Sequence, residues 1–186
     1  RSLTPTLDIG LSRSSEQKKP VTIFLKWKFI KQNERMPVTT TLMAQGNLNT
    51  FSSDNQSIDY TLQRRFTQDY SLLIAKKFTE NVSAQVGNHL IHKYLIEKRS
   101  DPNLSFHHSL VFRYKLNKRI AITGESGIPS PYSELSADFT FPWGLGVDIE
   151  TGGHVFQLHL SNSGQLTSQN ALTETRELQK VQEQLY

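Results

Sequence analysis

Polar and apolar residues alternate along most of the segment GVDIETGGHVFQLHLSNS, from Gly146 to Ser163. If this segment folds as a hairpin about Gly152-Gly153, Thr151 faces His154 and the register of the later pairs follows. One face then carries Ile149 with Phe156, Val147 with Leu158 and Leu145 with Leu160. The other face carries Glu150 with Val155, Asp148 with Gln157, Gly146 with His159 and Gly144 with Ser161. The pattern predicts two antiparallel strands with one apolar and one polar face.

The same period of two extends along most of the chain and predicts further β-strands. It is clearest in residues 21–31, where every second residue from Val21 to Phe29 is apolar. We expect strands at roughly 7–13, 21–31, 37–47, 66–78, 82–92, 105–116, 120–128, 141–151 and 154–163. Exceptions to the alternation are Phe24, Leu73, Ile91 and Val111 on the polar face and His108 on the apolar face. The sequence therefore predicts an all-β, antiparallel protein with at least nine strands.

Short and long connections alternate between the predicted strands. The short ones are Thr79-Glu80-Asn81, Asn117-Lys118-Arg119 and Gly152-Gly153, and the long ones are 48–65, 93–104 and 129–140. Short turns at one end and long loops at the other are typical of an up-and-down transmembrane β-barrel. Aromatic residues lie near both ends of the predicted strands, as expected at two membrane interfaces.

Alternation alone does not decide which face points inward. A soluble barrel buries its apolar face, whereas a membrane barrel turns that face to lipid and keeps a polar lumen. The polar face carries charges of both signs, which are costly in a dry interior and well solvated in a wet one. The candidate lumen-lining residues are Lys26, Lys28, Asp69, Arg113, Lys115, Glu125, Asp148, Glu150 and His159. The pattern favours a membrane barrel, with a soluble ligand-binding barrel as an alternative.

Composition narrows the class of protein further. The chain has 186 residues, a net charge of +4 and no cysteine, which excludes disulfide scaffolds, thiol catalysis and cysteine metal sites. Lys and Arg are scattered along the predicted strands without a nucleic-acid-binding motif, so we expect no nucleic-acid partner. There is no apolar run of about 18 residues, so we expect no transmembrane helix.

Four segments together resemble a known family. They are GVDIETGGHVFQLHLSNS, YSLLIAKKFTENVSAQ (70–85), FRYKLNKRIAI (112–122) and LDIGLSRSSEQK (7–18). They are similar to an uncharacterised family, a domain of unknown function, of Gram-negative bacterial outer-membrane β-barrel proteins. The similarity extends from Leu7 to about Thr175, and the hairpin around Gly152-Gly153 is its most specific part. The resemblance implies the bacterial outer membrane as location and membrane lipid as partner, but it implies no catalytic residues.

The two ends of the chain depart from the pattern of that family. Its members normally begin with a signal peptide and further strands and end in one more strand. Bacterial single-chain barrels also usually have an even number of strands. We therefore expect the chain to form part of a larger barrel, with barrel strands and loops in 1–163 and a loop or tail in 164–186. Leu178, Val181 and Leu185 recur at helical spacing in that tail, which indicates a possible short amphipathic helix.

Histidine and serine residues are the candidates for a metal site or a catalytic site. His89, His107 and His159 fall on the polar face, and His107 could meet His159 only if their strands place them at one height. Nothing in their spacing indicates a metal site. With a three-residue turn, Leu116 pairs with Ile120, so His108 would pair with residue 128 and Ser126 with Leu110. Ser126 and His108 would then be diagonal neighbours on the outward face, which is a weak signal for a hydrolase. We expect no metal, no cofactor and no catalytic residues.

The sequence thus predicts a non-enzymatic outer-membrane β-barrel. Its leading function is a conduit for small polar solutes, because a lining with both charge signs suits water. The alternative is a structural or interaction barrel with a closed lumen, acting as a subunit of an envelope protein complex whose other proteins are its partners.

Overall fold

A computed structural model describes residues 2–14, 20–50, 61–95, 102–129, 140–163, 171–173 and 175. These residues form one antiparallel sheet of ten strands, in which each strand pairs with the next along the chain. The strands are β1 (Ser2–Thr4), β2 (Leu7–Arg13), β3 (Pro20–Ile30), β4 (Thr39–Asn49), β5 (Phe66–Lys77), β6 (Val82–Lys93), β7 (Leu104–Lys115), β8 (Ile120–Pro129), β9 (Trp143–Glu150) and β10 (Val155–Ser161). The predicted all-β, up-and-down, antiparallel architecture is confirmed.

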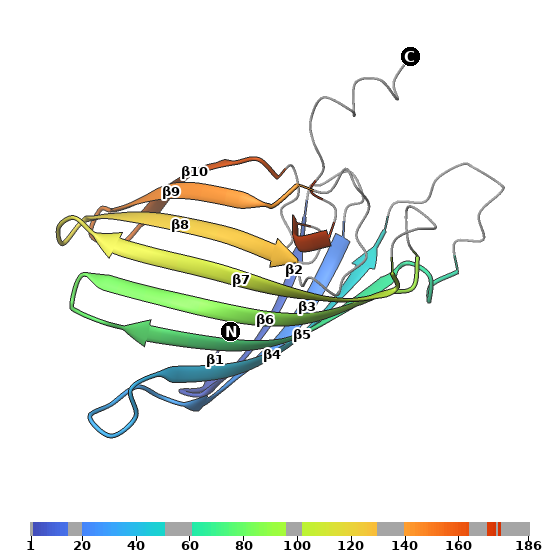
Figure 1. The fold of residues 1–186 in the computed structure, drawn as a ribbon, viewed down its shortest axis with the longest axis horizontal. Coiled ribbons are helices and arrows are strands. Elements are labelled where there is room, and N and C mark those ends of the chain that lie inside the picture. Colours follow the sequence, from blue (N-terminus) through green and yellow to red (C-terminus); the bar gives the residue numbers. More distant parts are fainter. Residues whose placement is uncertain are drawn as a thin grey trace, which may run out of the picture.

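The sheet is strongly curved, and its short turns lie at one end (Figure 1). The tenth strand, which the alternation did not predict, is β1, because three residues are too few to show a period of two. Among the described residues, β1 and β10 form the two ends of the sheet and are not paired with each other. The expectation of a larger barrel stays a prediction.

The hairpin of β9 and β10 has the register that the Gly-Gly turn predicts. All seven pairs are confirmed, from Glu150 opposite Val155 to Gly144 opposite Ser161. The backbone N–H of Thr151 donates to the carbonyl of His154 and closes the turn at 2.9 Å. A two-residue connection leaves no freedom to slip, so the polar and apolar faces of both strands coincide.

Gly152 adopts the left-handed conformation in this turn, with φ at 73°. A side chain at that φ is strained, so Gly152→Ala is expected to destabilise the protein by about 1 kcal/mol. Urea unfolding of protein folded into lipid vesicles measures this change. Gly153→Ala is the matched control, since Gly153 also has open space around it but no positive φ. Equal effects of both substitutions would contradict the assigned turn.

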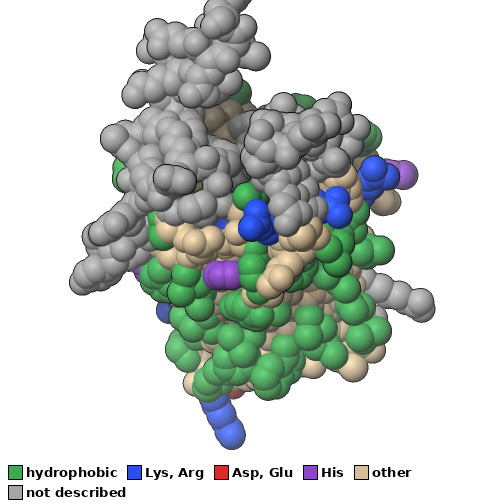
Figure 2. Space-filling model, turned by 90° about the vertical axis from the view of Figure 1, so that its right-hand side faces the viewer, with side chains coloured by type: hydrophobic (Ala, Val, Ile, Leu, Met, Phe, Trp, Pro, Cys, Tyr) green, Lys and Arg blue, Asp and Glu red, His purple; other side chains and the backbone are tan. Residues whose placement is uncertain are grey.

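One face of the sheet, here called the outer face, is apolar and exposed. Hydrophobic side chains cover much of the visible described surface, with Lys and Arg near its margins (Figure 2). Exposed residues of this face include Leu25, Trp27, Leu42, Ile74, Val86, Leu110, Phe112, Leu145 and Leu158. A soluble protein rarely exposes so large an apolar surface. The outer face therefore matches a wall that contacts lipid.

The opposite face, here called the inner face, buries polar side chains. Its buried polar residues include Thr22, Asn47, Thr67, Asp69, Ser71, His89, Ser105, His107 and Asp148. The hydroxyl of Thr22 donates to the side-chain oxygen of Asn47 at 2.6 Å, linking β3 to β4. This distribution inverts that of a soluble barrel, which buries its apolar side chains.

A short segment after β10 packs against the inner face. Residues 171–173 form a helical turn, and the side chains of Leu172 and Thr175 are buried. Leu172 lies against Gly127 of β8, where an added Cβ would contact it. The predicted helix around Leu178, Val181 and Leu185 lies outside the described residues. None of the described helical residues forms a helix long and apolar enough to cross a membrane.

Candidate functional site

Three neighbouring strands bring polar side chains together at the centre of the inner face. Ser71 of β5 lies opposite His89 of β6, and His89 lies opposite His107 of β7. Asp69 is two residues before Ser71 and therefore points to the same face. Ser109 is two residues after His107 and does the same. A cluster of Asp, Ser and His side chains thus follows from strand register alone.

A continuous chain of hydrogen bonds joins four of these side chains, here called the Asp69–Ser109 chain. The hydroxyl of Ser71 donates to Asp69 Oδ1 at 2.6 Å, and Ser71 Oγ lies 2.9 Å from His89 Nδ1. On the other side of the ring, His89 Nε2 lies 2.9 Å from Ser109 Oγ. The Asp69–Ser109 chain begins at the fully buried carboxylate of Asp69 and ends at the half-buried hydroxyl of Ser109.

The hydrogen bonds of the Asp69–Ser109 chain allow one arrangement of protons when the imidazole of His89 is neutral. An ionised Asp69 only accepts, so the single proton of the Ser71 hydroxyl points to Asp69. Ser71 Oγ can then only accept from His89, which places the ring proton on Nδ1. His89 Nε2 is left with a free lone pair and accepts from the hydroxyl of Ser109. This is the tautomer in which a histidine can remove a proton from a serine.

Gly87 leaves the space in which Ser109 and His89 meet. Gly87 lies opposite both Leu73 and Ser109 in the sheet. An added Cβ at Gly87 would contact the Ser109 hydroxyl and would lie 2.6 Å from His89 Nε2. Real Cβ atoms do not approach other atoms so closely, so any larger residue at this position would separate the two side chains.

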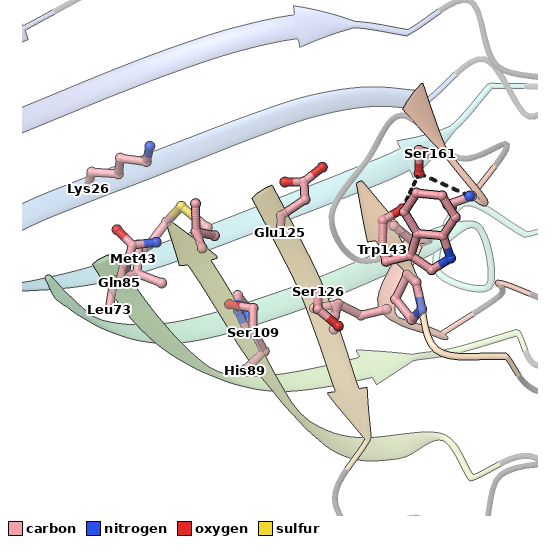
Figure 3. A pocket seen from close by; sticks show the side chains of 16 residues that line it. Lys26, Met43, Leu73, Gln85, His89, Ser109, Glu125, Ser126, Trp143 and Ser161 are labelled. Carbon is pink, nitrogen blue, oxygen red and sulfur yellow. Dashed lines mark hydrogen bonds between the residues drawn. The ribbon is translucent and has the colours of Figure 1, made fainter. Parts of the chain in front are cut away.

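Ser109 and His89 border a cavity of about 330 Å³ on the inner face. Figure 3 shows the two side chains next to each other, with Gln85, Leu73 and Met43 on one side and Ser126 and Trp143 on the other. Leu73 and Val111, two of the apolar exceptions on the polar face, both line this cavity. Two of the exceptions to the alternation therefore lie beside the serine and the histidine.

A second serine–histidine pair lies two residues away on β7. His107 Nε2 is 2.9 Å from Ser105 Oγ, and both side chains are buried. His107 Nδ1 is buried without a hydrogen-bond partner in the described structure. Unlike His89, His107 has no hydroxyl–carboxylate pair that would orient its ring.

The structure places the predicted lumen-lining residues along the inner face in four groups. Asp69 belongs to the Asp69–Ser109 chain, while Lys26 and Glu125 border the same cavity as Ser109. Arg113 Nε donates to Asp148 Oδ2 at 3.2 Å, and Gln157 donates to the other carboxylate oxygen at 2.9 Å. Near the short turns, Lys28 and Arg113 line a second cavity and Lys115 a third. Glu150 and His159 are exposed residues of the terminal hairpin.

The register shows how the histidine and serine candidates of the sequence lie relative to one another. His159 lies opposite Gly146, in the row that runs through Thr123 to Arg113, so it does not share a height with His107. His108 lies opposite Ile128 and Ser126 opposite Leu110, as the turn after Leu116 predicts. His108 Nδ1 is 2.9 Å from the side-chain oxygen of Asn88, a neighbour on the other side.

Within the described ranges, no group of three or more His, Cys, Asp or Glu residues has a geometry that could hold a metal ion. The hydrogen bonds of the Asp69–Ser109 chain define its chemistry. Sequence reasoning placed His89 on the polar face but did not single out Ser71 or Ser109. The signal for Ser71 was present, because the turn at Thr79-Glu80-Asn81 sets Ser71 opposite His89.

The fold and its two faces define a class of protein, an up-and-down β-barrel wall with an apolar outside and a polar inside. Comparison with known families agrees with that class. The model of a family described as membrane bound beta barrel domain (DUF5777) matches residues 2–184, and the chain belongs to this family. The membrane location and the predicted resemblance are thereby confirmed. No curated protein and no solved structure matches the chain.

Proposed function

We propose that this barrel lies in a bacterial outer membrane and acts as a conduit for small polar solutes. The observation that carries the proposal is the Arg113–Asp148 pair on the inner face. The Arg113 side chain keeps 39 % of its surface exposed while it contacts Asp148. A charged pair that stays accessible to water suits a wet lumen, whereas a closed lumen would need such charges to be fully paired and packed.

A cationic cavity near the short turns supports a preference for anionic solutes. It has a volume of about 430 Å³, and its lining includes Lys28, Lys31, Lys77 and Arg113. No Asp or Glu of the described residues lines it. A concave surface with one sign of charge raises the local concentration of the opposite ion.

Conductance in a planar bilayer tests the proposal. Full-chain protein is expected to give discrete current steps with a preference for anions. The double variant Lys28→Gln/Lys77→Gln is expected to lower the anion-to-cation permeability ratio by roughly two- to tenfold at low salt, and less at high salt. Asp148→Asn removes a negative charge and is expected to change the ratio in the opposite direction.

The matched control is Lys118→Gln, because Lys118 is an exposed residue of a short turn and borders neither cavity. Its permeability ratio is expected to equal that of the unmodified protein. If the folded, membrane-inserted protein passes no current, the proposal of a conduit is wrong. Current with the same ratio in every variant would overturn the assigned anion preference.

A second candidate function is an interaction barrel within an envelope protein complex. It is favoured by residues 171–173, in which Leu172 is buried against Gly127 of the inner face. A segment seated inside a barrel narrows the lumen. Absence of current together with co-purification of another envelope protein would support this candidate.

A further inference from the structure

We propose that Ser109 is a nucleophile and His89 its general base, and that they hydrolyse carboxylic esters with a short apolar acyl group. The inference goes beyond the conduit, because it needs access of an ester to the inner face but no passage of solute through the protein. It differs from the sequence-based expectation of a non-enzymatic barrel.

The first support is the direction of the hydrogen bonds in the Asp69–Ser109 chain. A serine hydroxyl is a weak nucleophile until a neighbouring base accepts its proton. His89 Nε2 lies 2.9 Å from Ser109 Oγ, within the range that proton transfer requires. The Ser71–Asp69 pair holds the ring proton on Nδ1, so the lone pair of Nε2 faces Ser109.

The second support is the buried carboxylate of Asp69. Its Oδ1 is held by Ser71, while Oδ2 is buried without a hydrogen-bond partner in the described structure. Asp69 Oδ2 lies 3.5 Å from His89 Nδ1. When His89 accepts a proton, the negative charge nearest to the new imidazolium is therefore already in place. Asp69 acts through His89 and is a positioning residue.

The third support is the space around Ser109. The residues opposite it on both neighbouring strands are glycines, Gly87 on β6 and Gly127 on β8. No Cβ from either strand therefore covers its hydroxyl. The adjoining cavity, about 330 Å³, is large enough for a small ester, since ligand sites begin near roughly 300 Å³.

The lining of that cavity indicates the class of substrate. Met43, Leu73 and Val111 provide an apolar surface for an acyl chain, although all three lie on the polar face of the sheet. Gln85 and Lys26 line the same cavity, and both side chains can donate to a negatively charged oxygen. A cavity with both apolar side chains and hydrogen-bond donors suits an ester better than a free ion, because an ester has an apolar acyl chain and a carbonyl oxygen.

The chemical step follows from these positions. Ser109 Oγ bonds to the ester carbonyl carbon while its proton moves to His89 Nε2. Collapse of the tetrahedral intermediate breaks the bond to the alcohol oxygen, which takes that proton from Nε2. Water then gives a proton to Nε2 and attacks the acyl carbon, and Ser109 leaves with the proton. Ester and water are converted to acid and alcohol, and no other reactant is needed.

Labelling of full-chain protein in detergent with a fluorophosphonate probe tests the nucleophile. The probe is expected to modify Ser109, as identified by mass spectrometry of the labelled peptide. Ser109→Ala should remove the labelling, and His89→Gln should slow it by about 10²- to 10⁴-fold. Unlabelled wild-type protein, or equal labelling of Ser109→Ala, would overturn the proposal.

Ser105→Ala is the matched control. Ser105 also contacts a histidine Nε2, but that histidine lacks the orienting pair and the serine is buried. Labelling of this variant is expected to equal that of wild type. The heat-dependent shift of each variant on an electrophoretic gel shows that it has folded, so a loss of labelling is assigned to the missing group.

Nuclear magnetic resonance tests the positioning residues separately. The ¹⁵N shifts of His89 are expected to show the Nδ1-protonated tautomer in wild type. Ser71→Ala and Asp69→Asn are expected to shift His89 toward the other tautomer, a change that a purely structural role would not require. An unchanged tautomer in both variants would remove Asp69 and Ser71 from the mechanism.

Turnover of 4-nitrophenyl butyrate tests the substrate class. Wild-type protein is expected to release nitrophenol, and Ser109→Ala is not. Labelled Ser109 without turnover would overturn ester hydrolysis as the reaction. Ser109→Ala should keep its bilayer conductance, so failure of the hydrolase proposal and failure of the conduit proposal are separate results.

Discussion

Val86→Arg is expected to destabilise the folded barrel by about 2–4 kcal/mol, the cost of an arginine facing lipid near the middle of the bilayer. Val86 lies near the middle of β6 on the outer face, between Ile74 and Leu110, and its side chain is exposed. In lipid, the guanidinium would have neither water nor an acidic neighbour on that face. Urea unfolding of protein folded into lipid vesicles measures the effect.

Gln85→Arg is the matched control for this prediction. Gln85 precedes Val86 in the same strand but points to the inner face, where it borders two cavities. An arginine there has room and water, so we expect a change within about 1 kcal/mol. If Val86→Arg leaves the free energy of unfolding unchanged while Gln85→Arg lowers it, the assignment of the outer and inner faces is reversed.

His89→Leu is expected to cost about 1–3 kcal/mol, because it removes the imidazole that bonds Ser71 and Ser109 and leaves buried polar groups beside Asp69 without a partner. Asp69 is fully buried and would keep only the hydroxyl of Ser71, its partner in the structure. The double variant Asp69→Asn/His89→Leu should recover part of the loss, since a neutral amide is less costly to bury than a carboxylate. Urea unfolding in vesicles again provides the measurement.

His159→Leu is the control for the His89 substitution. His159 is an exposed residue of β10, so its replacement is expected to change the stability by less than about 0.5 kcal/mol. If His89→Leu proves equally neutral, the Asp69–Ser109 chain does not contribute to folding. Failure of the double variant to recover stability would show that the cost comes from lost packing rather than from the buried charge.

The amino-acid sequence determined the elements, their faces and the register across every short turn. The Gly152-Gly153 turn predicted all seven pairs of β9 and β10. The turn after Leu116 predicted the register of β7 and β8 in the same way. Short loops have few allowed conformations, and a slip of one residue would turn every side chain to the wrong face, so both signals are visible in the sequence.

Register across a long loop could not be obtained in this way. The connection between β6 and β7 is long enough for several registers, and each would keep the apolar side chains outside if shifted by two residues. The contact of His89 with Ser109 depends on this register, in which Gly87 lies opposite Ser109. The serine of the proposed active site therefore had no signal in the chain alone.

The apolar exceptions show the same division between sequence and structure. Leu73 and Val111 interrupt the polar face, and the alternation offers no reason for them. In the structure they lie on different strands but line one cavity beside His89 and Ser109. Local alternation determined the wall and its two environments, because it depends only on neighbouring residues. Tertiary structure decided what the inside of the wall brings together across the long loops, because the register of strands joined by a long loop is set by packing of the whole sheet.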